Sequence, residues 1–450
     1  MEEYIMSNFD VLFIGSGQGA WNAAMPLSMS GQKVAIIERD KIAGVCTNYG
    51  CNPKIILDGP IKVMEDAQAY KGIGMTSEMK INWSELMAHK NKVLDALPVM
   101  LEENFKKAGI EVIKGEASFV NEKTVAVNGQ EYTADKIVIA SGQRPTPLDI
   151  PGKEYLKTSN EFLYLEDLPD HIVFVGAGYV SMELASIAVK VGATVHVIQS
   201  SDHILNEFHQ PYAQKLLTKM QQDGIQFHFN EKLSKVEQQG EQLQITTEKG
   251  LTLTTQLVIN ATGRVPNVEN LNLEAAGVEY NSKGIIVDEY LQTTQKGIYA
   301  SGDILDKKQP RLTPTAVFEA KYLAASFLGA QTQAIEYPPI ATIAFTVPRI
   351  AQIGVTIEEA EATGLTIKPI DLGKQWDFAG RNETEAHLNL VYDQEQKLVG
   401  ATAYSQEALE IINSLTPIIT LGLTSKEVDK LIYAFPSFET MIPRYMQETK

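Results

Sequence analysis

The chain begins with apolar runs separated by glycine-rich turns. An apolar run over residues 10–14 leads into Gly15-Ser16-Gly17-Gln18-Gly19-Ala20, and residues 21–30 then predict a helix that Gly31 ends. Residues 33–38 predict a second strand, whose last residue is the acid Glu38. A strand, a glycine turn, a helix and a strand with a terminal acid are typical of a dinucleotide-binding site.

The same pattern returns in the middle of the chain. An apolar run over residues 171–175 leads into Gly176-Ala177-Gly178-Tyr179-Val180-Ser181, followed by a helix through Lys190 and a strand over residues 194–199. The glycine that opens each turn and the residue that ends each second strand are 23 positions apart in both copies. We therefore expect two nucleotide sites, because agreement in both composition and register is improbable by chance.

The remaining segments complete two nucleotide-binding folds and leave a third region. Similar strands end at Ala140-Ser141-Gly142 and at Ala261-Thr262-Gly263-Arg264, and each is expected to close one fold. Turn dipeptides at residues 128–129, 239–240 and 249–250 predict inserted antiparallel meanders, and a strand over residues 298–303 returns the chain to the first fold. From residue 334 onward the sequence has no nucleotide signature. The predicted α/β architecture therefore has two Rossmann-like domains and a C-terminal α+β interface domain, over residues 1–148 with 264–333, 149–263 and 334–450.

Composition and charge exclude several classes of partner. A chain of 450 residues exceeds one core, and 44% hydrophobic with 21% charged residues is typical of a globular protein. The formal net charge of -17 is spread along the chain without a basic run, which disfavours nucleic acid and anionic lipid surfaces. The first ten residues lack the basic and apolar parts of an export signal, and no apolar run reaches membrane-spanning length. We expect a cytoplasmic protein with no membrane contact.

The chain has only two cysteines, Cys46 and Cys51. In a reducing compartment such a pair is more often catalytic or metal-binding than a structural disulfide. A zinc site is disfavoured because no other cysteine and no nearby histidine completes four ligands, so no metal is expected. Lys54 places a cation near the pair, and a nearby cation together with a helix start lowers a thiol pKa. The alternative is a packed pair of small apolar side chains.

Residues 43–54, Ala-Gly-Val-Cys-Thr-Asn-Tyr-Gly-Cys-Asn-Pro-Lys, resemble the active-site signature of the glutathione reductase and dihydrolipoamide dehydrogenase family. These are FAD-dependent pyridine nucleotide-disulfide oxidoreductases. The chain departs from the Gly-Gly-Thr-Cys part of the pattern at Ala43 and Val45 but keeps the cysteine spacing and the Pro-Lys pair. The resemblance covers nearly the whole chain, because the second glycine unit, both closing motifs, Gly302-Asp303 and Leu312-Thr313-Pro314 fall in family order.

The resemblance implies a catalytic role for four residues. Cys46 would be the thiol that exchanges with substrate, and Cys51 would be the thiol beside the flavin. Lys54 and Glu183 would pair next to the flavin ring.

The resemblance also implies which residues bind FAD and NAD(P)H. Tyr179 would cover the nicotinamide pocket until the cofactor enters, and Asp303 would bind the ribityl and phosphate region of FAD. The expected cofactor-binding residues are Gly15, Gly17, Gln18, Gly19, Ala20, Glu38, Gly44, Val45, Ala117, Ser141, Gly142, Gly176, Gly178, Tyr179, Val180, Gln199, Ser200, Gly263, Arg264, Asp303 and Thr313.

The end of the second strand differs between the two copies. Glu38 is placed to accept both ribose hydroxyls, whereas the second copy has Gln199 followed by Ser200. A carboxylate would repel a 2′-phosphate and this neutral strip tolerates one, although no arginine is present to attract it. NADPH is favoured modestly, and NADH remains possible. An ordinary solvated loop indifferent to the phosphate is the alternative.

The C-terminal region departs from the family at one catalytic position. Family members that reduce disulfides offer a His-Pro-Thr segment whose histidine protonates the departing thiolate, but Phe435 stands at that position here. A phenyl ring cannot transfer a proton, and general acid catalysis is typically worth about 10² to 10⁴-fold. Glu439 or Tyr433 could substitute, although each is better interpreted as an interface residue. Positions that bind glutathione also differ, with Met25 and Leu101 in place of arginine and tyrosine.

The sequence therefore predicts a homodimeric flavoprotein that passes electrons from NAD(P)H through FAD to a Cys46–Cys51 disulfide and on to a small disulfide acceptor. A metal-ion or quinone reductase is the first alternative, because such acceptors need no general acid. A redox-sensing flavoprotein with low turnover is the second.

Overall fold

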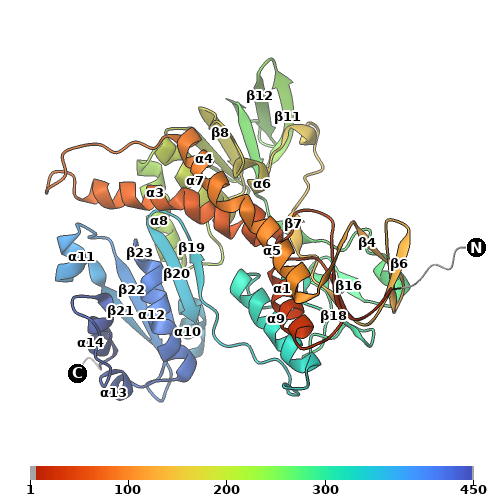
Figure 1. The fold of residues 1–450 in the computed structure, drawn as a ribbon. Coiled ribbons are helices and arrows are strands. Elements are labelled where there is room, and N and C mark those ends of the chain that lie inside the picture. Colours follow the sequence, from red (N-terminus) through yellow and green to blue (C-terminus); the bar gives the residue numbers. More distant parts are fainter. Residues whose placement is uncertain (1–6, 448–450) are drawn as a thin grey trace, which may run out of the picture. The chain divides into compact units, whose positions relative to one another are not determined.

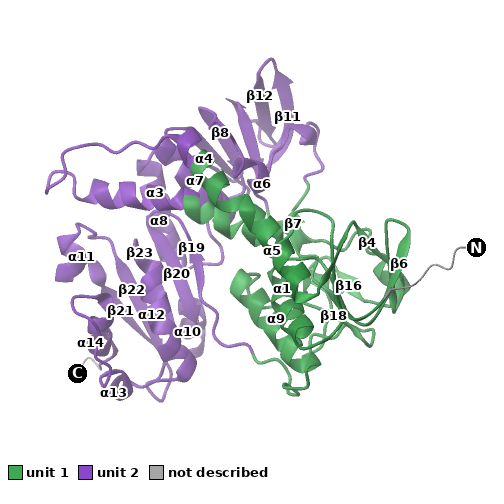
Figure 2. Ribbon diagram, viewed as in Figure 1, with its two compact units in different colours: residues 1–56, 87–147, 263–336 green, residues 57–86, 148–262, 337–450 purple. Residues whose placement is uncertain are grey.

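The computed structural model describes residues 7–447 of the chain (Figure 1). Residues 1–6, on which the expectation about an export signal partly rests, and residues 448–450 lie outside the described part. The described chain forms two compact units (Figure 2). Unit 1 comprises residues up to 56, 87–147 and 263–336, and unit 2 comprises residues 57–86, 148–262 and 337 onward. This division does not test the predicted domain boundaries, which stay a prediction.

Unit 1 is built on a largely parallel sheet. Its core strand β1 (Ser7–Ile14) pairs in parallel with β2 (Val34–Glu38) on one side and with β6 (Gln130–Ile139) on the other. Residues 11–14 of β1 are buried apolar side chains, as expected for a strand covered on both faces. The other strands of this unit are β3 (Glu111–Lys114), β4 (Ala117–Asn121), β5 (Thr124–Val127), β7 (Gln143–Pro145), β15 (Arg264–Pro266), β16 (Tyr280–Asn281), β17 (Gly284–Ile285) and β18 (Ile298–Ala300).

Two helices of unit 1 that are far apart in the sequence pack against each other. Helix α1 (Gln18–Met29) follows β1 and packs against α9 (Thr313–Phe327). The remaining helical segments are α2 (Gly44–Tyr49), α5 (Ala96–Ala108), η2 (Leu273–Ala276) and η3 (Gly302–Ile304). Helices α3 (Cys51–Ala69) and α4 (Trp83–Leu94) each have residues in both units, because the division between the units falls after residue 56 and after residue 86.

The return strand expected over residues 298–303 is shorter than predicted. Strand β18 pairs in parallel with β6, which confirms that the chain returns to the first sheet, but it ends at Ala300. Gly302, with φ +82°, then begins the 3-10 turn η3. The Gly-Asp pair therefore caps the strand end as a helical turn instead of continuing the strand, because the left-handed backbone at Gly302 cannot extend a strand.

Unit 2 contains the second glycine unit. Strand β8 (His171–Val175), helix α7 (Tyr179–Val191) and strand β9 (Thr194–Gln199) follow the predicted order, and β8 pairs in parallel with β9 and β14 (Leu257–Asn260). The other segments between residues 148 and 262 are η1 (Lys153–Tyr155), α6 (Ser159–Phe162), α8 (Gln210–Gln222), β10 (Gln226–Phe229), β11 (Leu233–Gln239), β12 (Gln242–Thr247) and β13 (Thr252–Thr255). Strands β11, β12 and β13 form a separate antiparallel sheet, which confirms the inserted meander.

The C-terminal part of unit 2 is an antiparallel sheet covered by helices. Its strand order is β19 (Thr342–Ala344), β20 (Arg349–Gly354), β23 (Leu398–Ser405), β22 (His387–Tyr392) and β21 (Thr366–Asp371). Its helical segments are α10 (Ile357–Thr363), η4 (Leu372–Lys374), α11 (Trp376–Gly380), α12 (Ala408–Leu421), α13 (Ser425–Val428), η5 (Phe438–Met441) and α14 (Ile442–Met446). Helix α12 packs on β20 and β23, and the predicted α/β fold class with a mixed C-terminal region is confirmed.

A buried ion pair fastens α3 to this sheet within unit 2. The Arg349 guanidinium on β20 lies 2.5 Å from the Asp58 carboxylate on α3, and both side chains are almost fully buried. The guanidinium also lies over the Phe345 ring, 5.2 Å from its centroid. A buried charge is tolerated when its partner is present and is costly when the partner is removed.

We expect Asp58→Ala to destabilise the protein by about 3–5 kcal/mol, because it leaves Arg349 buried and unpaired. The double variant Asp58→Met with Arg349→Met removes both charges and is expected to be no less stable than the wild type. Thermal unfolding of the three proteins measures the difference. Equal destabilisation by the single and double variants would contradict this prediction, because it would show that the loss of stability does not come from an unpaired buried charge.

Candidate active site and cofactor sites

The two thiols lie at consecutive helix segments of unit 1. Cys46 is inside the short helix α2, Gly50 breaks the chain out of that helix, and α3 begins at Cys51. Cys51 is exposed and Cys46 is half-buried. The Cys51 Sγ lies 3.5 Å from the Oγ1 of Thr313, the first residue of α9. The predicted site residues Cys46, Cys51 and Thr313 therefore come together.

The environment separates the pKa values of the two thiols. The hydrogen bond that Cys46 donates is the largest cause that lowers the pKa of Cys51 to about 6, with further contributions from Thr313 and the charge of Lys54. The same hydrogen bond, together with burial, raises the pKa of Cys46. Because the pKa of Cys51 lies below 7, its sulfur is a thiolate at neutral pH while Cys46 keeps its proton.

A buried serine ties the cysteine helix to the end of β2. The Ser16 Oγ donates to the Glu38 carboxylate at 2.6 Å and accepts from the backbone N–H of Ala43 at 3.1 Å. Ser16 is fully buried, and Ala43 has φ +82° at the start of α2. Sequence reasoning missed Ser16, whose only signal is its place between the glycines of the first turn.

The two glycine turns have the same backbone geometry. The Gly15 N–H donates to the Ile37 carbonyl and the Gly176 N–H to the Ile198 carbonyl, both at 2.8 Å. A Cβ on Gly15 would lie 2.5 Å from the Ala140 carbonyl oxygen, and one on Gly176 would lie 2.6 Å from the Ala261 carbonyl oxygen. Both glycines also have positive φ, so no other residue fits either turn.

Both turns leave a helix start open to an anionic ligand. The caps of α1 and α7 are Gly17 and Gly178, neither has a side-chain cap, and neither helix has an acid in its first turn. Helices α6, α10 and α13, in contrast, are closed by Thr-Glu capping boxes. The hydroxyl of Ser181 in the first turn of α7 is buried without a partner among the described residues. These features fit the pyrophosphate of a dinucleotide at each turn.

The two closing motifs pair with each other. Strands β7 and β15 form an antiparallel ribbon in unit 1, and an Arg264 guanidinium nitrogen donates to the Gln143 carbonyl at 2.7 Å. The Ser141 Oγ donates to the Asn267 carbonyl at 2.9 Å, and the Asn267 amide donates back to the Ser141 carbonyl at 2.7 Å. Residues 264–266 pair with the strand that follows Gly142, in line with the expected return of the chain to the first fold at residue 264, and the closing role of each motif stays a prediction.

The two strand ends that the sequence assigns to the ribose groups differ in their contacts. The Glu38 carboxylate accepts from Ser16 and from the Asp40 backbone N–H, which fixes its orientation. The Gln199 amide donates to the Ser201 Oγ at 2.7 Å and to the His203 carbonyl at 3.3 Å. Ser200 is exposed beside it.

The other predicted site residues are distributed over both units. Gly19 lies against Ser301, Ala117 is buried in β4, and Val45 is 39% exposed. Tyr179 is partly exposed at the first position of α7, followed by Val180. Gln18 and Ala20 stand in the first turn of α1, and Gly44 begins α2.

Glu183 is held by a contact that sequence reasoning missed. Its side chain is almost fully buried in α7 and accepts a hydrogen bond from the backbone N–H of Phe345 at 2.8 Å. Lys54 belongs to unit 1 and Glu183 to unit 2, so the pairing of these two residues stays a prediction.

Phe435 lies in an exposed apolar segment of unit 2. Its side chain is 76% exposed, and its ring centroid is 6.4 Å from that of the exposed Trp376. Burial opposes ionisation of Glu439, but hydrogen bonds from Ser414 and Ser437 hold its pKa below the usual value. Glu439 is therefore a carboxylate at neutral pH and a poor replacement for the missing acid.

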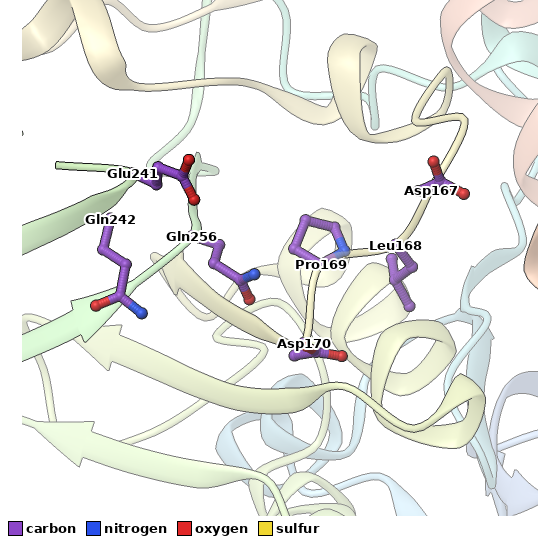
Figure 3. Close-up of a pocket in the computed structure, with 7 residues that line it drawn as sticks. All are labelled: Asp167, Leu168, Pro169, Asp170, Glu241, Gln242 and Gln256. Atoms are coloured by element: carbon purple, nitrogen blue, oxygen red, sulfur yellow. The ribbon is translucent and has the colours of Figure 1, made fainter.

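A shallow pocket of unit 2 contains none of the predicted site residues (Figure 3). It is lined by Asp167, Leu168, Pro169, Asp170, Glu241, Gln242 and Gln256. Within residues 7–447, no group of three or more His, Cys, Asp or Glu side chains is placed to hold a metal ion. No helix of that part of the chain is long and apolar enough to cross a membrane.

Comparison with known proteins places these features in one family. Residues 9–320 match the pyridine nucleotide-disulphide oxidoreductase family, and residues 340–445 match the dimerisation domain of that family. The chain belongs to this family. The FAD and NAD(P)H dependence and the oxidoreductase class expected from the sequence are confirmed, and this oxidoreductase is a flavoprotein of the disulfide oxidoreductase type.

Several relatives of this oxidoreductase carry different names. A glutathione reductase of Nostoc sp. is 32% identical, with 96% of this chain and 97% of that protein covered. A mercuric reductase of Staphylococcus aureus is 31% identical, with 96% of this chain and 80% of that protein covered. The Cu(II) complex of the HOCl-induced flavoprotein disulfide reductase from Escherichia coli has a TM-score of 0.86 at 24% identity, with 96% of this chain and 98% of that chain covered. This last likeness concerns the fold.

We predict that the reduced protein contains one thiolate that is lost as the pH falls through about 6, because the lowered pKa belongs to Cys51. Cys46→Ala removes the donor to Cys51 and should move the titration upward, toward the ordinary thiol value of about 8.5. Thiolate absorbance near 240 nm, measured against pH on the reduced wild type and on the two single alanine variants of Cys46 and Cys51, gives the pKa values. An unchanged titration in Cys46→Ala would contradict the coupling.

Proposed function

We propose that this oxidoreductase is a homodimeric disulfide reductase in which NAD(P)H, with NADPH preferred, delivers electrons through FAD to the Cys46–Cys51 disulfide and on to a small disulfide. The observation that carries the proposal is the arrangement of the thiols at consecutive helix segments, with the Cys51 Sγ 3.5 Å from the Thr313 Oγ1 and with Cys46 lowering the pKa of Cys51. When bound, FAD supplies the two-electron link between the nicotinamide and the cysteine pair. Cys46, Cys51, Lys54, Glu183 and the cofactor-binding residues act as assigned from the resemblance.

The thiol chemistry balances with an external disulfide as oxidant. Cys46, after losing its proton, attacks one sulfur of the acceptor, which forms a mixed disulfide and releases the first thiolate. The Cys51 thiolate then attacks the Cys46 sulfur, which closes the intramolecular disulfide and releases the second thiolate. Two electrons leave the cysteine pair and reduce the acceptor to two thiolates, and the proton that Cys46 loses passes to solvent water.

The proton balance limits which acceptors suit this site. Phe435 cannot protonate a departing thiolate, and Glu439 is ionised at neutral pH. A leaving thiolate of low pKa needs no proton donor, since it is stable as the anion. We therefore infer an acceptor disulfide with acidic thiols.

A metal-ion or quinone reductase is the second candidate. It is favoured by the identity of 31% to a mercuric reductase and by Phe435, since such acceptors also need no general acid. In that case electrons can reach the acceptor without a mixed disulfide, and the Cys46 thiol is dispensable for part of the activity.

We predict that kcat/KM of the wild type rises steeply as the leaving-group pKa falls across a series of aromatic and aliphatic disulfides. Phe435→His combined with Thr440→Glu, which restores the family's acid and its orienting carboxylate, should accelerate aliphatic disulfides by about 10² or more and change acidic ones little. Phe435→Leu with Thr440→Glu is the matched control, because it restores no proton donor.

The same series separates the two candidates. Negligible turnover of every disulfide, with Cys46→Ser still reducing quinones or Hg²⁺, would show the metal-ion or quinone reductase in place of the disulfide reductase.

We predict that the wild type uses NADPH at least as well as NADH, because Gln199 and Ser200 place no carboxylate near the 2′ position. Gln199→Glu should add the ribose acceptor, repel the 2′-phosphate and shift the preference toward NADH by tenfold or more, a difference of about 1.4 kcal/mol. The measurement is the ratio of kcat/KM for the two cofactors, with Gln199→Met as the uncharged control. A wild-type preference for NADH above about tenfold would reject the prediction.

A further inference from the structure

The turn that carries Asp303 is fixed at both ends by side chains from other segments of unit 1. On one side the backbone N–H of Gly302 donates to the Glu319 Oε2 at 2.6 Å. On the other side the Arg311 Nε donates to the Asp303 carbonyl at 3.3 Å, and the same guanidinium donates to the Leu305 carbonyl at 2.9 Å. No side chain caps the 3-10 helix η3 from within, so Glu319 acts as its cap from α9.

Glu319 is a fully buried carboxylate, 0% exposed. Its second oxygen, Oε1, accepts from the Lys307 Nζ at 2.5 Å, and the Lys307 side chain is only 6% exposed. Both carboxylate oxygens are therefore used, one by an ammonium group and one by a backbone amide. An ionised buried carboxylate is tolerated when it is paired in this way, and the pairing fixes its orientation.

The Asp303 carboxylate itself is left available. Within residues 7–447 it makes no hydrogen bond or ion pair, and the residue is partly exposed. Its backbone neighbours, in contrast, have their polar groups satisfied by Glu319 and Arg311. A fixed backbone with a free charged side chain is the arrangement expected of a preorganised ligand-binding group.

The same turn is attached to the first glycine turn. The Ser301 Oγ donates to the Gly19 carbonyl at 2.5 Å, and a Cβ on Gly19 would meet Ser301 at 3.2 Å. The position of η3 is therefore set relative to the open start of α1, where a pyrophosphate fits. Any shift of Gly302 moves Asp303 relative to that cradle.

We propose that Glu319, held in place by Lys307, is a positioning residue that fixes Asp303 for FAD. The inference rests on the proposed function, in which Asp303 contacts FAD. Glu319 touches no cofactor in this scheme and acts through the backbone N–H of Gly302.

Two double variants isolate the hydrogen bond to Gly302. The glutamine double variant, Glu319→Gln with Lys307→Met, removes both charges but keeps an oxygen that accepts from the Gly302 N–H. The methionine double variant, Glu319→Met with Lys307→Met, removes the charges and the acceptor, while the side chain at position 319 keeps nearly the same length. The dissociation constant of FAD for each deflavinated protein is measured by flavin fluorescence, and the thermal unfolding midpoint of each apoprotein is measured in parallel.

We expect the methionine double variant to bind FAD about tenfold or more weakly than the glutamine double variant, since a lost acceptor leaves a buried N–H unpaired. Arg311→Met, which removes the contact to the Asp303 carbonyl, should also weaken FAD binding. Glu65→Met with Lys190→Met removes a Lys-Glu pair of unit 2 at 2.7 Å without changing net charge, leaves the Lys219–Asp223 pair intact and should bind FAD like the wild type.

The outcomes separate this inference from the proposed function. Equal FAD affinity of the two Glu319 double variants would overturn the positioning role, as would a loss that follows apoprotein stability alone across all variants. If the wild type binds no FAD, or if Asp303→Asn binds it unchanged, the assignment of Asp303 fails and the inference falls with it. Weaker binding by the methionine double variant at matched apoprotein stability supports the positioning role.

Discussion

Backbone packs directly on backbone where the first glycine turn meets the cysteine helix, and the site depends on this contact. A Cβ on Gly44 would lie 2.7 Å from the Gly17 Cα, closer than any side chain allows. Gly17 is the N-cap of α1 and Gly44 is the first residue of α2. This contact therefore fixes the start of α1 relative to the helix that contains Cys46. The nucleotide turn and the redox thiols are therefore positioned by a single constraint that only glycine satisfies.

The elements that the sequence predicted are those whose signal is local. The glycine turns, the flanking strands and the 23-residue spacing are contained within short stretches, and the structure repeats them with matching carbonyl contacts at Ala140 and Ala261. Periodicity and turn chemistry are sufficient for such segments. The cysteine spacing is equally local, and the structure places Cys46 inside α2 and Cys51 at the start of α3.

What the sequence could not predict is set by contacts between distant segments. The ribbon of β7 and β15 joins residues about 120 positions apart, and Glu183 meets the backbone of Phe345 across 162 positions. The sequence does not single out Glu319 or Ser16, because neither belongs to a recognisable motif position. Each forms its hydrogen bond to a residue that only the fold brings near. The strand expected to reach Asp303 also ends early, at Ala300, and Gly302 then has a positive φ and donates its N–H to Glu319 on α9.

Buried charge is used in two different ways in this chain. Asp58 with Arg349 and Glu319 with Lys307 are closed pairs, in which each charge has a partner and fastens one segment to another. The helix starts at Gly17 and Gly178 and the carboxylate of Asp303 are left without such partners in the described chain. Closed pairs fix geometry, whereas open groups can still receive a ligand, so the open groups support the proposed positions of the cofactors.

The same distinction applies to the thiols and explains why the missing histidine matters. Within the pair the negative charge is placed on Cys51 and the proton on Cys46, so the nucleophile must lose a proton before it attacks. A family member with a histidine has a second group that can move protons at this step, whereas Phe435 offers only an apolar surface. In the proposed reaction the two sulfurs divide charge and proton between themselves, and Phe435 supplies no proton to a departing thiolate. We therefore propose an acceptor that leaves as a stable anion, or one that takes electrons without bond cleavage, in preference to an ordinary aliphatic disulfide.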